Sequence, residues 1–305
     1  MRRDAWRRDP ASYPLRGEFE PRYVDVDVWQ HLNNTALISM HGEAVQRALR
    51  GLLGEDAWRR ADPALACTAS ATDFLAEGRY PAPLAWGARV LRVDAHGLHL
   101  ASALFQHGQC VGLHGCTLAG WSGGGTAGLG AEVIAALRAA GVPGADSADP
   151  GTAPAVAAAP ESDAAHFPWR TTLATRFSDS DAVRLASDHC LARFAEQVRV
   201  DFMGQVFDAR TRGVGGMLVA HVGLRWVHRA APGPRWEAGC GVAHVGERSV
   251  ALRSAMFDAG RCVAASESVM VTIDPESRRS VPVPAAARDA LARYRLGVAG
   301  DAGAG

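Results

Sequence analysis

Lysine is absent from this sequence, since all 32 of its basic residues are arginine. This absence excludes a Schiff-base lysine and a phosphate-binding loop built on lysine, and it leaves arginine as the only strong phosphate ligand. The 32 basic residues are balanced by 32 acidic ones. We therefore do not expect a nucleic acid or an anionic membrane surface to be the main partner.

Long apolar runs are also absent. No window approaches the roughly 18 consecutive apolar residues of a membrane-spanning helix, and the charged segment 1–15 lacks the apolar run of a secretory signal. None of the six cysteines belongs to a Cys-x-x-Cys pair, and most lie in apolar, strand-like runs. We predict reduced, mostly buried thiols in a cytoplasmic protein. These cysteines are Cys67, Cys110, Cys116, Cys190, Cys240 and Cys262.

Two segments of the chain occur twice at nearly the same spacing. Residues 22–27 read Arg-Tyr-Val-Asp-Val-Asp, and residues 176–181 read Arg-Phe-Ser-Asp-Ser-Asp. Residues 105–111 (Phe-Gln-His-Gly-Gln-Cys-Val) likewise match residues 257–263 (Phe-Asp-Ala-Gly-Arg-Cys-Val). Repeats this far apart are whole domains rather than solenoid units, so the sequence predicts a tandem duplication.

The composition suggests where the two copies begin and end. An N-terminal arm (1–14) precedes a first unit (15–122), and a Gly/Ala/Pro-rich linker with a short helix (123–165) leads to a second unit (166–292) and a C-terminal tail (293–305). We expect most of the linker to be flexible or partly extended.

Each unit shows the same expected order of elements, a long amphipathic helix followed by about four strands. The helix of the first unit is predicted to end at Gly54. Its apolar face comprises Leu37, Ala44, Val45, Ala48, Leu49 and Leu52, and that of the second helix comprises Leu191, Phe194, Val198 and Phe202. One helix followed by antiparallel strands predicts an α+β fold in which a sheet packs on a single helix. The strand-like runs are 66–75, 84–93, 97–105 and 110–121, and then 217–227, 236–245, 249–257 and 261–273.

The segment at residues 23–34 carries a polar motif, written aromatic-x-Asp-x-Asp-x-x-x-His-x-Asn-Asn. This motif and the order of elements resemble the hotdog-fold thioesterases, typified by 4-hydroxybenzoyl-CoA thioesterase. Its Gln-His-x-Asn-Asn portion is also similar to the acyl-acyl-carrier-protein thioesterases, which fuse two hotdog units. The resemblance implies two tandem hotdog units, each a long central helix wrapped by an antiparallel sheet, forming an intramolecular pseudo-dimer.

The same resemblance implies a thioester hydrolase that acts on acyl-CoA or an acyl-carrier-protein in fatty acid or polyketide metabolism. Asp27 matches the family's catalytic carboxylate, a general base for water or a nucleophile. His31 and Asn33 are near enough in sequence to position the reactants, and Glu43 matches a second acidic position. Unpaired amides at the start of the helix near Asn34 are expected to stabilise the oxyanion.

Other residues of the motif have expected binding or structural roles. Trp29 and Asn34 are candidates for substrate binding, and arginines not identified from the sequence would hold phosphates or an acidic carrier surface. Asn33 and Asn34 are also good helix caps, so a capping role alone stays open for both. Asp25 is expected to be structural, because its counterpart Asp179 persists in the second copy.

The second copy has lost much of the motif. Leu185 stands where the first copy has His31, and a leucine side chain can neither donate, accept nor titrate. Ser187 and Asp188 replace the two asparagines, whereas Asp181 is kept in the place of Asp27. The second site is therefore either inactive or dependent on Asp181 alone, and the second copy is expected to serve as a wall of the first site.

Three other patterns are weaker. Residues 123–128 satisfy Gly-x-Gly-x-x-Gly, but no parallel strand follows to complete a dinucleotide-binding unit. His189 and Cys190 near a helix start suggest an activated thiol, although a buried cysteine is the commoner outcome. The histidines of the first copy's strands show no three-ligand spacing for zinc; they are His96, His99, His107 and His114. We expect no metal and no redox cofactor.

Two alternatives to hydrolysis stay open at this point. A dehydratase or another acyl-thioester enzyme could use the same fold, although such enzymes generally need a histidine paired with an acid across the groove. A non-catalytic binder of acyl thioesters would be consistent with the loss of motif residues in the second copy. The oligomeric state is also open, since a fused pair is self-sufficient but could form a homo-oligomer of pseudo-dimers.

Overall fold

The structure is a computed structural model that describes residues 4–59, 63–122, 125–148, 162–207, 216–229, 231–274 and 276–297. The chain forms an α+β fold divided into two compact units. The first unit contains residues 1–156 together with 180–189, and the second contains residues 157–179 together with 190–305. Among the described residues, no helix is both long enough and apolar enough to cross a membrane.

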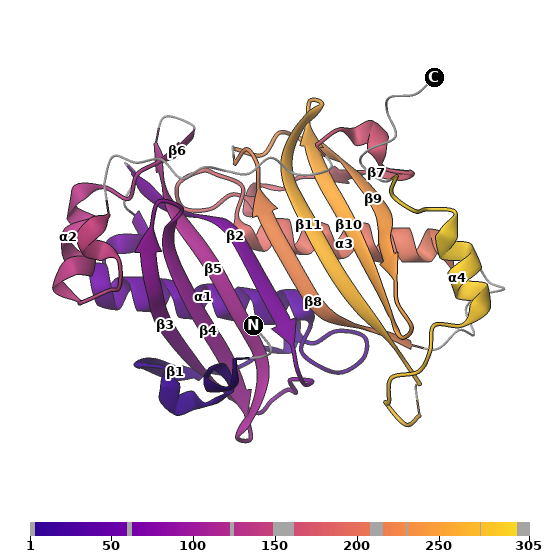
Figure 1. The fold of residues 1–305 in the computed structure, drawn as a ribbon, viewed down its shortest axis with the longest axis horizontal. Coiled ribbons are helices and arrows are strands. Elements are labelled where there is room, and N and C mark those ends of the chain that lie inside the picture. The colour runs from indigo at the N-terminus through magenta and orange to yellow at the C-terminus, as the bar shows by residue number, and fades with distance from the viewer. Residues whose placement is uncertain are drawn as a thin grey trace. The chain divides into compact units, whose positions relative to one another are not determined.

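The sheet of the first unit is antiparallel, in the order β1-β3-β4-β5-β2, and the short β6 pairs with β5. Helix α1 crosses this sheet behind strands β3, β4 and β5 (Figure 1). The strands are β1 (Leu15–Phe19), β2 (Ala64–Phe74), β3 (Leu84–Asp94), β4 (Gly97–Gln106), β5 (Gln109–Ser122) and β6 (Gly125–Ala127). The helices are α1 (Asn34–Leu53) and α2 (Ala131–Ala139), with short 3₁₀ helices η1 (Ala5–Arg8), η2 (Pro10–Ser12), η3 (Tyr23–Asp25), η4 (Ala57–Arg59) and η5 (Ala145–Ser147).

Helix α1 begins and ends where the sequence predicts. Asn33 is its N-cap, and Gly54 follows its last residue at φ 92°, where its amide bonds the Arg50 carbonyl. This left-handed region costs a glycine little. The predicted apolar face is buried at five of its six positions, and Leu52 is partly buried. The sheet therefore packs on the apolar face of this helix.

The segment after β5, expected in the sequence to be linker, is part of the first unit over residues 125–148. Val133, Ile134 and Leu137 of α2 are buried in the same core cluster as α1 and the sheet. The Val93 amide also donates to the Pro143 carbonyl at 2.8 Å. Burial of an apolar helix face, invisible in the composition, explains the difference. Residues 123–124 and 149–161 of the expected linker lie outside the described residues.

The substitution Ile134→Val tests this placement. Removing one buried methylene from a packed site is expected to lower the free energy of unfolding by about 1 kcal/mol. Ile134 is 1% exposed, so the loss should be measurable by urea unfolding. Val200→Ala, at an exposed position of the second unit, is the comparison and should change stability by less than about 0.5 kcal/mol. Equal, negligible effects of both would show that α2 does not contribute to the core.

The N-terminal arm also packs on the first unit. Tyr13 is fully buried, and its hydroxyl donates to the Arg7 carbonyl at 2.7 Å. The Arg7 guanidinium, itself buried, donates to the His114 carbonyl of β5 at 2.6 Å. The arm is therefore held in place by a buried polar network, rather than being a free extension.

The second unit repeats the layout of the first. Its antiparallel sheet has the order β8-β11-β10-β9-β7, which matches β2-β5-β4-β3-β1 strand for strand. Its strands are β7 (Trp169–Ala174), β8 (Gly216–Trp226), β9 (Arg235–Val245), β10 (Ser249–Asp258) and β11 (Arg261–Ile273). Its helices are α3 (Asp188–Val206) and α4 (Ala285–Ala292), with η6 (Ala164–His166) and η7 (Phe177–Asp179).

Part of the expected C-terminal tail belongs to the second unit as well. The Val242 amide donates to the Tyr294 carbonyl at 2.8 Å, and the Leu296 amide donates to the Val242 carbonyl at 3.0 Å. These two bonds attach the chain after α4 to the edge of β9. Residues 298–305 lie outside the described part of the chain.

Candidate active site

Asp25 organises the approach to the first motif. Its carboxylate accepts hydrogen bonds from the Arg22 amide at 2.7 Å and from the Arg22 guanidinium at 2.8 Å. Burial alone would raise the pKa of Asp25, but the hydrogen bonds and charge of Arg22 hold this pKa below its usual value. The Asp25 carbonyl accepts the Asn33 amide at 2.8 Å. Asp25 thus fixes the residue that caps α1, as its expected structural role requires.

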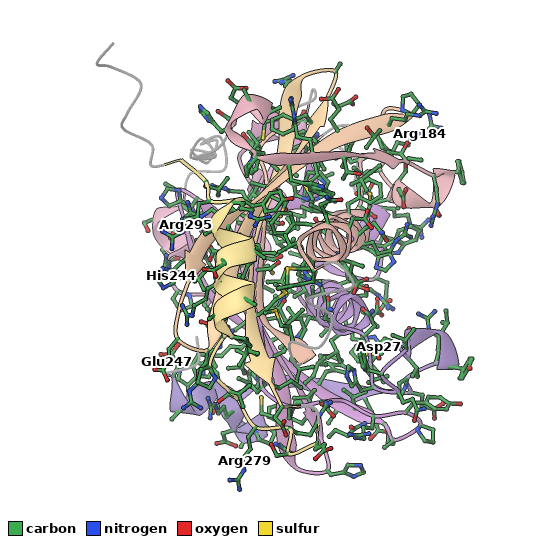
Figure 2. The ribbon with its side chains drawn as sticks, turned by 90° about the vertical axis from the view of Figure 1, so that its right-hand side faces the viewer. Asp27, Arg184, His244, Glu247, Arg279 and Arg295 are labelled. Atoms are coloured by element: carbon green, nitrogen blue, oxygen red, sulfur yellow. The ribbon has the colours of Figure 1, made fainter. Side chains whose placement is uncertain are left out.

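The residues between η3 and α1 form a tight turn around Asp27 (Figure 2). The Asp27 amide donates to the His31 carbonyl at 2.9 Å, and the Gln30 amide donates to the Asp27 carbonyl at 3.0 Å. Gln30 adopts φ 63°, a left-handed conformation that non-glycine residues rarely adopt. Asp27 Oδ1 accepts the Trp29 amide at 2.9 Å. One carboxylate oxygen therefore stabilises the backbone of the turn, which leaves the other for a side-chain contact.

That second oxygen meets the histidine of the motif. Asp27 Oδ2 lies 3.2 Å from His31 Nδ1, and the two side chains are only 15% and 13% exposed. A carboxylate oxygen can only accept, so the pair favours the His31 tautomer with its proton on Nδ1. His31 Nε2 is buried and has no hydrogen-bond partner among the described residues. The turn thus holds a mostly buried imidazole that a carboxylate orients, and such a pair can act chemically as a general base where a reactant reaches Nε2.

Asn33 acts as the expected cap of α1. Its Oδ1 accepts the Thr35 amide at 2.6 Å and the Thr35 hydroxyl at 2.8 Å. Asn34 is the first residue of the helix. Both asparagines are therefore at the start of α1, and they follow His31 closely in the sequence. Their catalytic and binding roles stay predictions.

Glu43 and Trp29 lie at more exposed positions. Glu43 is 49% exposed and pairs with Arg47 at 2.8 Å, and the Arg47 guanidinium lies 4.7 Å from the centre of the Phe19 ring. The structure thus joins Glu43 to Arg47 rather than to Asp27 or His31. Trp29 is 70% exposed. Their expected roles in catalysis and substrate binding stay predictions.

The second motif keeps the turn of the first without its imidazole. The Asp181 amide donates to the Leu185 carbonyl at 2.7 Å, and Arg184 adopts φ 64°, as Gln30 does. Asp181 Oδ1 accepts both the Val183 amide at 3.0 Å and the Leu185 amide at 2.9 Å. Arg184 lies on the loop that carries this turn (Figure 2). The aspartate that both motifs share therefore holds the loop, and Leu185 takes the place of His31.

His189 and Cys190, considered as a thiol pair in the sequence, have separate surroundings. Cys190 is fully buried, and desolvation raises the pKa of its thiol to about 12. His189 groups with the first unit, where its Nδ1 lies 2.6 Å from Ser39 Oγ of α1. The buried, unreactive cysteine is the expected alternative. The contact with Ser39 could not be read from the sequence.

A pair of buried histidines is a second feature that sequence reasoning missed. His41, on the buried side of α1, stacks on His114 of β5 with ring centres 5.1 Å apart. His41 Nδ1 lies 2.9 Å from Ser102 Oγ, and His114 Nδ1 lies 2.8 Å from Thr72 Oγ1. The sequence signal that could have revealed this pair is His41 itself, a polar residue on the apolar face of α1.

The remaining sequence patterns do not form a site. Within the described ranges, no cluster of three or more His, Cys, Asp or Glu side chains is arranged to hold a metal ion. His99 instead pairs with Asp94 at 2.8 Å and lies 3.1 Å from Thr117 Oγ1. Residues 123–124 of the glycine-rich segment lie outside the described residues. Its described part contains β6, which runs antiparallel to β5, whereas a dinucleotide-binding unit has parallel strands.

Comparisons with known proteins agree on the fold. No protein-family model and no curated protein sequence matches the chain. A structure assigned as an oleoyl thioesterase from Lactobacillus plantarum superposes with a TM-score of 0.65 at 14% identity, over 90% of this chain and 99% of its own. The 12:0-ACP thioesterase from Umbellularia californica superposes with a TM-score of 0.63 at 11% identity, over 85% and 94%.

A third structure, an acyl-ACP thioesterase from Bacteroides thetaiotaomicron, superposes with a TM-score of 0.57 at 12% identity, over 84% of this chain and 97% of its own. All three cover most of both chains, so the likeness extends through both units rather than one. At these identities the comparison concerns the fold and leaves the chemistry to the site. This chain shares the fold of these three structures, the hotdog fold that the motif and the order of its elements predict.

Proposed function

We propose that the protein is an acyl-thioester hydrolase that releases a carboxylic acid from acyl-CoA or an acyl-carrier-protein. The observation that carries this proposal is the Asp27–His31 pair, 3.2 Å apart and mostly buried, on the turn that leads into α1. Three solved structures with this fold are described as thioesterases, which supports the reaction class. The dehydratase alternative needs a histidine and an acid across the groove, whereas Asp27 and His31 lie on one turn. The loss of motif residues that fits a non-catalytic binder is confined to the second copy.

In the proposed reaction, a water molecule attacks the thioester carbonyl carbon and gives its proton to His31 Nε2. Asp27 holds the imidazole by its Nδ1–H and stabilises the imidazolium that forms. The tetrahedral intermediate then expels the thiolate, which takes the proton from Nε2, and the carboxylic acid is released. The sequence instead predicts that Asp27 itself reacts, either as the general base for water, with His31 positioning the reactants, or by direct attack that forms a mixed anhydride, which water cleaves.

The developing oxyanion would be stabilised at the start of α1. Helix N-termini carry unpaired amides and a favourable dipole, and a well-placed donor contributes about 3 kcal/mol. The Thr35 amide already binds the Asn33 side chain and the Leu37 amide binds the Asn33 carbonyl, so neither of these two amides is assigned this role. Arginine side chains would bind the phosphates of CoA or the acidic surface of a carrier.

We further propose that the two units form an intramolecular pseudo-dimer with one intact site. Both sheets have the same strand order, and the second motif, in residues 180–189, groups with the first unit. The proposed site would then draw on both repeats, with residues 15–122 and 166–292 as the two hotdog units. A cytoplasmic location and a homo-oligomer of such pseudo-dimers are parts of this proposal.

The test is release of free thiol from a panel of acyl-CoAs and acyl-carrier-proteins that vary in chain length. We expect turnover on at least one member. Binding of an acyl thioester without turnover would instead favour the non-catalytic binder, and conversion of a hydroxyacyl thioester to an enoyl thioester would favour the dehydratase.

A single turnover in oxygen-labelled water separates the two hydrolytic routes. When His31 is the base, the acid released in the first turnover carries the label, because its new oxygen comes from water. When Asp27 is the nucleophile and water cleaves the anhydride at the Asp27 carbonyl, the first product carries no label, because its oxygen comes from the carboxylate. Cleavage at the acyl carbonyl would label the product as well, so the His31 route also requires that mass spectrometry of the quenched enzyme shows no acyl adduct on Asp27. We expect a labelled product.

A further inference from the structure

His189 belongs to the second repeat by sequence but contacts the first unit. It is the second residue of α3, in the segment 180–189 that packs with residues 1–156. Its Nδ1 lies 2.6 Å from Ser39 Oγ. Ser39 lies in the second turn of α1, and its hydroxyl donates to the Thr35 carbonyl at 2.9 Å. A side chain of the second repeat is thereby attached to the beginning of the first repeat's central helix.

The two hydrogen bonds of Ser39 determine the direction of the contact. Its single hydroxyl proton is directed to the Thr35 carbonyl, so Oγ meets His189 as an acceptor. His189 must therefore donate from Nδ1–H, whether its ring is neutral or charged. The contact does not need a particular charge state of the imidazole, and it fixes the orientation of the ring relative to α1.

His189 also acts on the other residue that fixes the helix start. Its charge contributes, after burial and Arg22, to the ionisation of Asp25, which places the ring in electrostatic range of that buried carboxylate. The Asp25 carbonyl holds the Asn33 amide at 2.8 Å. His189 is thus linked through Ser39 to Thr35, which follows the N-cap Asn33. It also lies near Asp25, which holds the Asn33 amide.

The two repeats place their histidines at different positions. When the two motifs are aligned, Leu185 corresponds to His31, and His189 corresponds to Thr35. The second repeat therefore has no histidine at the position of His31 and has one four residues later, at the second residue of α3. The position at which it occurs is the one that contacts the first unit.

We infer that His189 is a positioning residue of the proposed active site, supplied by the second repeat. Through Ser39 it holds the first turns of α1, whose amides the proposed reaction uses for the oxyanion. This inference rests on the proposed function. It explains why a repeat without a working motif is retained beside the intact one.

The test compares His189→Ala, Ser39→Ala and the double variant on the substrate found by the thiol-release panel. Each single variant is expected to lower kcat about tenfold and leave KM within twofold, because misplaced donors weaken only the transition state. The double variant should lose no more than either single one, since both remove the same bond. His189→Asn, whose side-chain amide can still donate to Ser39 Oγ, should recover most of kcat.

His166→Ala, at an exposed histidine of the second unit, is the matched control and should retain wild-type kcat. A kcat for His189→Ala within twofold of wild type would overturn the inference, as would additive losses in the double variant. A fall in kcat that follows a fall in melting temperature and is not recovered by His189→Asn would also overturn it, as a general packing effect. Absence of wild-type turnover would instead overturn the proposed function, and the inference with it.

Discussion

Asp27→Asn lowers kcat/KM for the preferred acyl thioester by about a hundredfold or more, the scale of losing a general base or its orienting group. The asparagine Oδ1 can still accept the Trp29 amide that Asp27 Oδ1 accepts at 2.9 Å, so the turn should persist. The asparagine NH₂ group, however, would lie against His31 Nδ1 and donate a hydrogen bond to it, whereas the carboxylate oxygen accepts one from Nδ1–H. The imidazole would then favour the tautomer with its proton on Nε2, which cannot take a proton from water. Steady-state kinetics with thiol detection measure the loss.

The same substitution at Asp181 is the matched comparison. Asp181 accepts two backbone amides of its own turn, and Leu185 stands where the first motif has its imidazole. Asp181→Asn should therefore lower kcat/KM far less than Asp27→Asn does. Turnover that survives Asp27→Asn and is lost in Asp181→Asn would place the chemistry in the second motif. Melting temperatures of both variants show whether a loss reflects unfolding.

Lowering the pH from about 7 to 4 should strongly destabilise the first unit. Burial, with a contribution from the charge of Arg7, lowers the pKa of His114 from 6.5 to about 4. Burial and the neighbouring His114 also hold the pKa of His41 well below 6.5. A histidine whose folded pKa is depressed binds more protons when unfolded, so stability is complete above the unfolded pKa and falls as the pH drops toward the folded one.

The size of the effect follows from the shift. Each unit of pKa difference corresponds to about 1.4 kcal/mol, so His114 alone should account for a loss of about 3 kcal/mol between pH 6.5 and 4, and His41 adds to it. The pKa values of Asp25 and Asp94 are lowered from 3.8 in the folded protein. Their contribution to stability is therefore lost mainly below pH 4, as the carboxylates become protonated. The two windows are therefore separable in a series of urea unfolding curves.

Replacing one buried imidazole tests the assignment. His41→Leu removes a titrating group that is fully buried, so the slope of unfolding free energy against pH between 6.5 and 4 should become shallower. His96→Leu, at an exposed histidine of the same unit, should leave the slope unchanged. Equal slopes in wild type and both variants would contradict the assignment to the buried pair.

The sequence was most informative where local pattern and repetition coincide. The apolar stripe and Gly54 predicted α1 with its C-terminal end, and alternating runs predicted the strands of both units. The repeated Arg-aromatic-x-Asp-x-Asp segment predicted that the two units share a layout. These features depend on residues close together in the chain, which helical and strand periodicity reveal.

Contacts between distant residues could not be predicted in this way. His41 and Ser102 meet across 61 positions, and Ser39 and His189 across 150, so neither pair leaves a local signature. The linker composition similarly concealed that Ile134 packs into the core. Within the motif, the sequence supplied the residues Asp27 and His31 but not their geometry, because the turn depends on a left-handed Gln30 that no glycine marks.

The matching left-handed residues Gln30 and Arg184 have a consequence for protein design. Both turns keep a demanding backbone shape, although only one keeps the imidazole, so the shape does not depend on the chemistry that it carries. The second loop is accordingly a vacant scaffold, already folded and already furnished with a carboxylate. Leu185→His changes one side chain there, and under the proposed function it would give the second loop the same aspartate–histidine pair as the first.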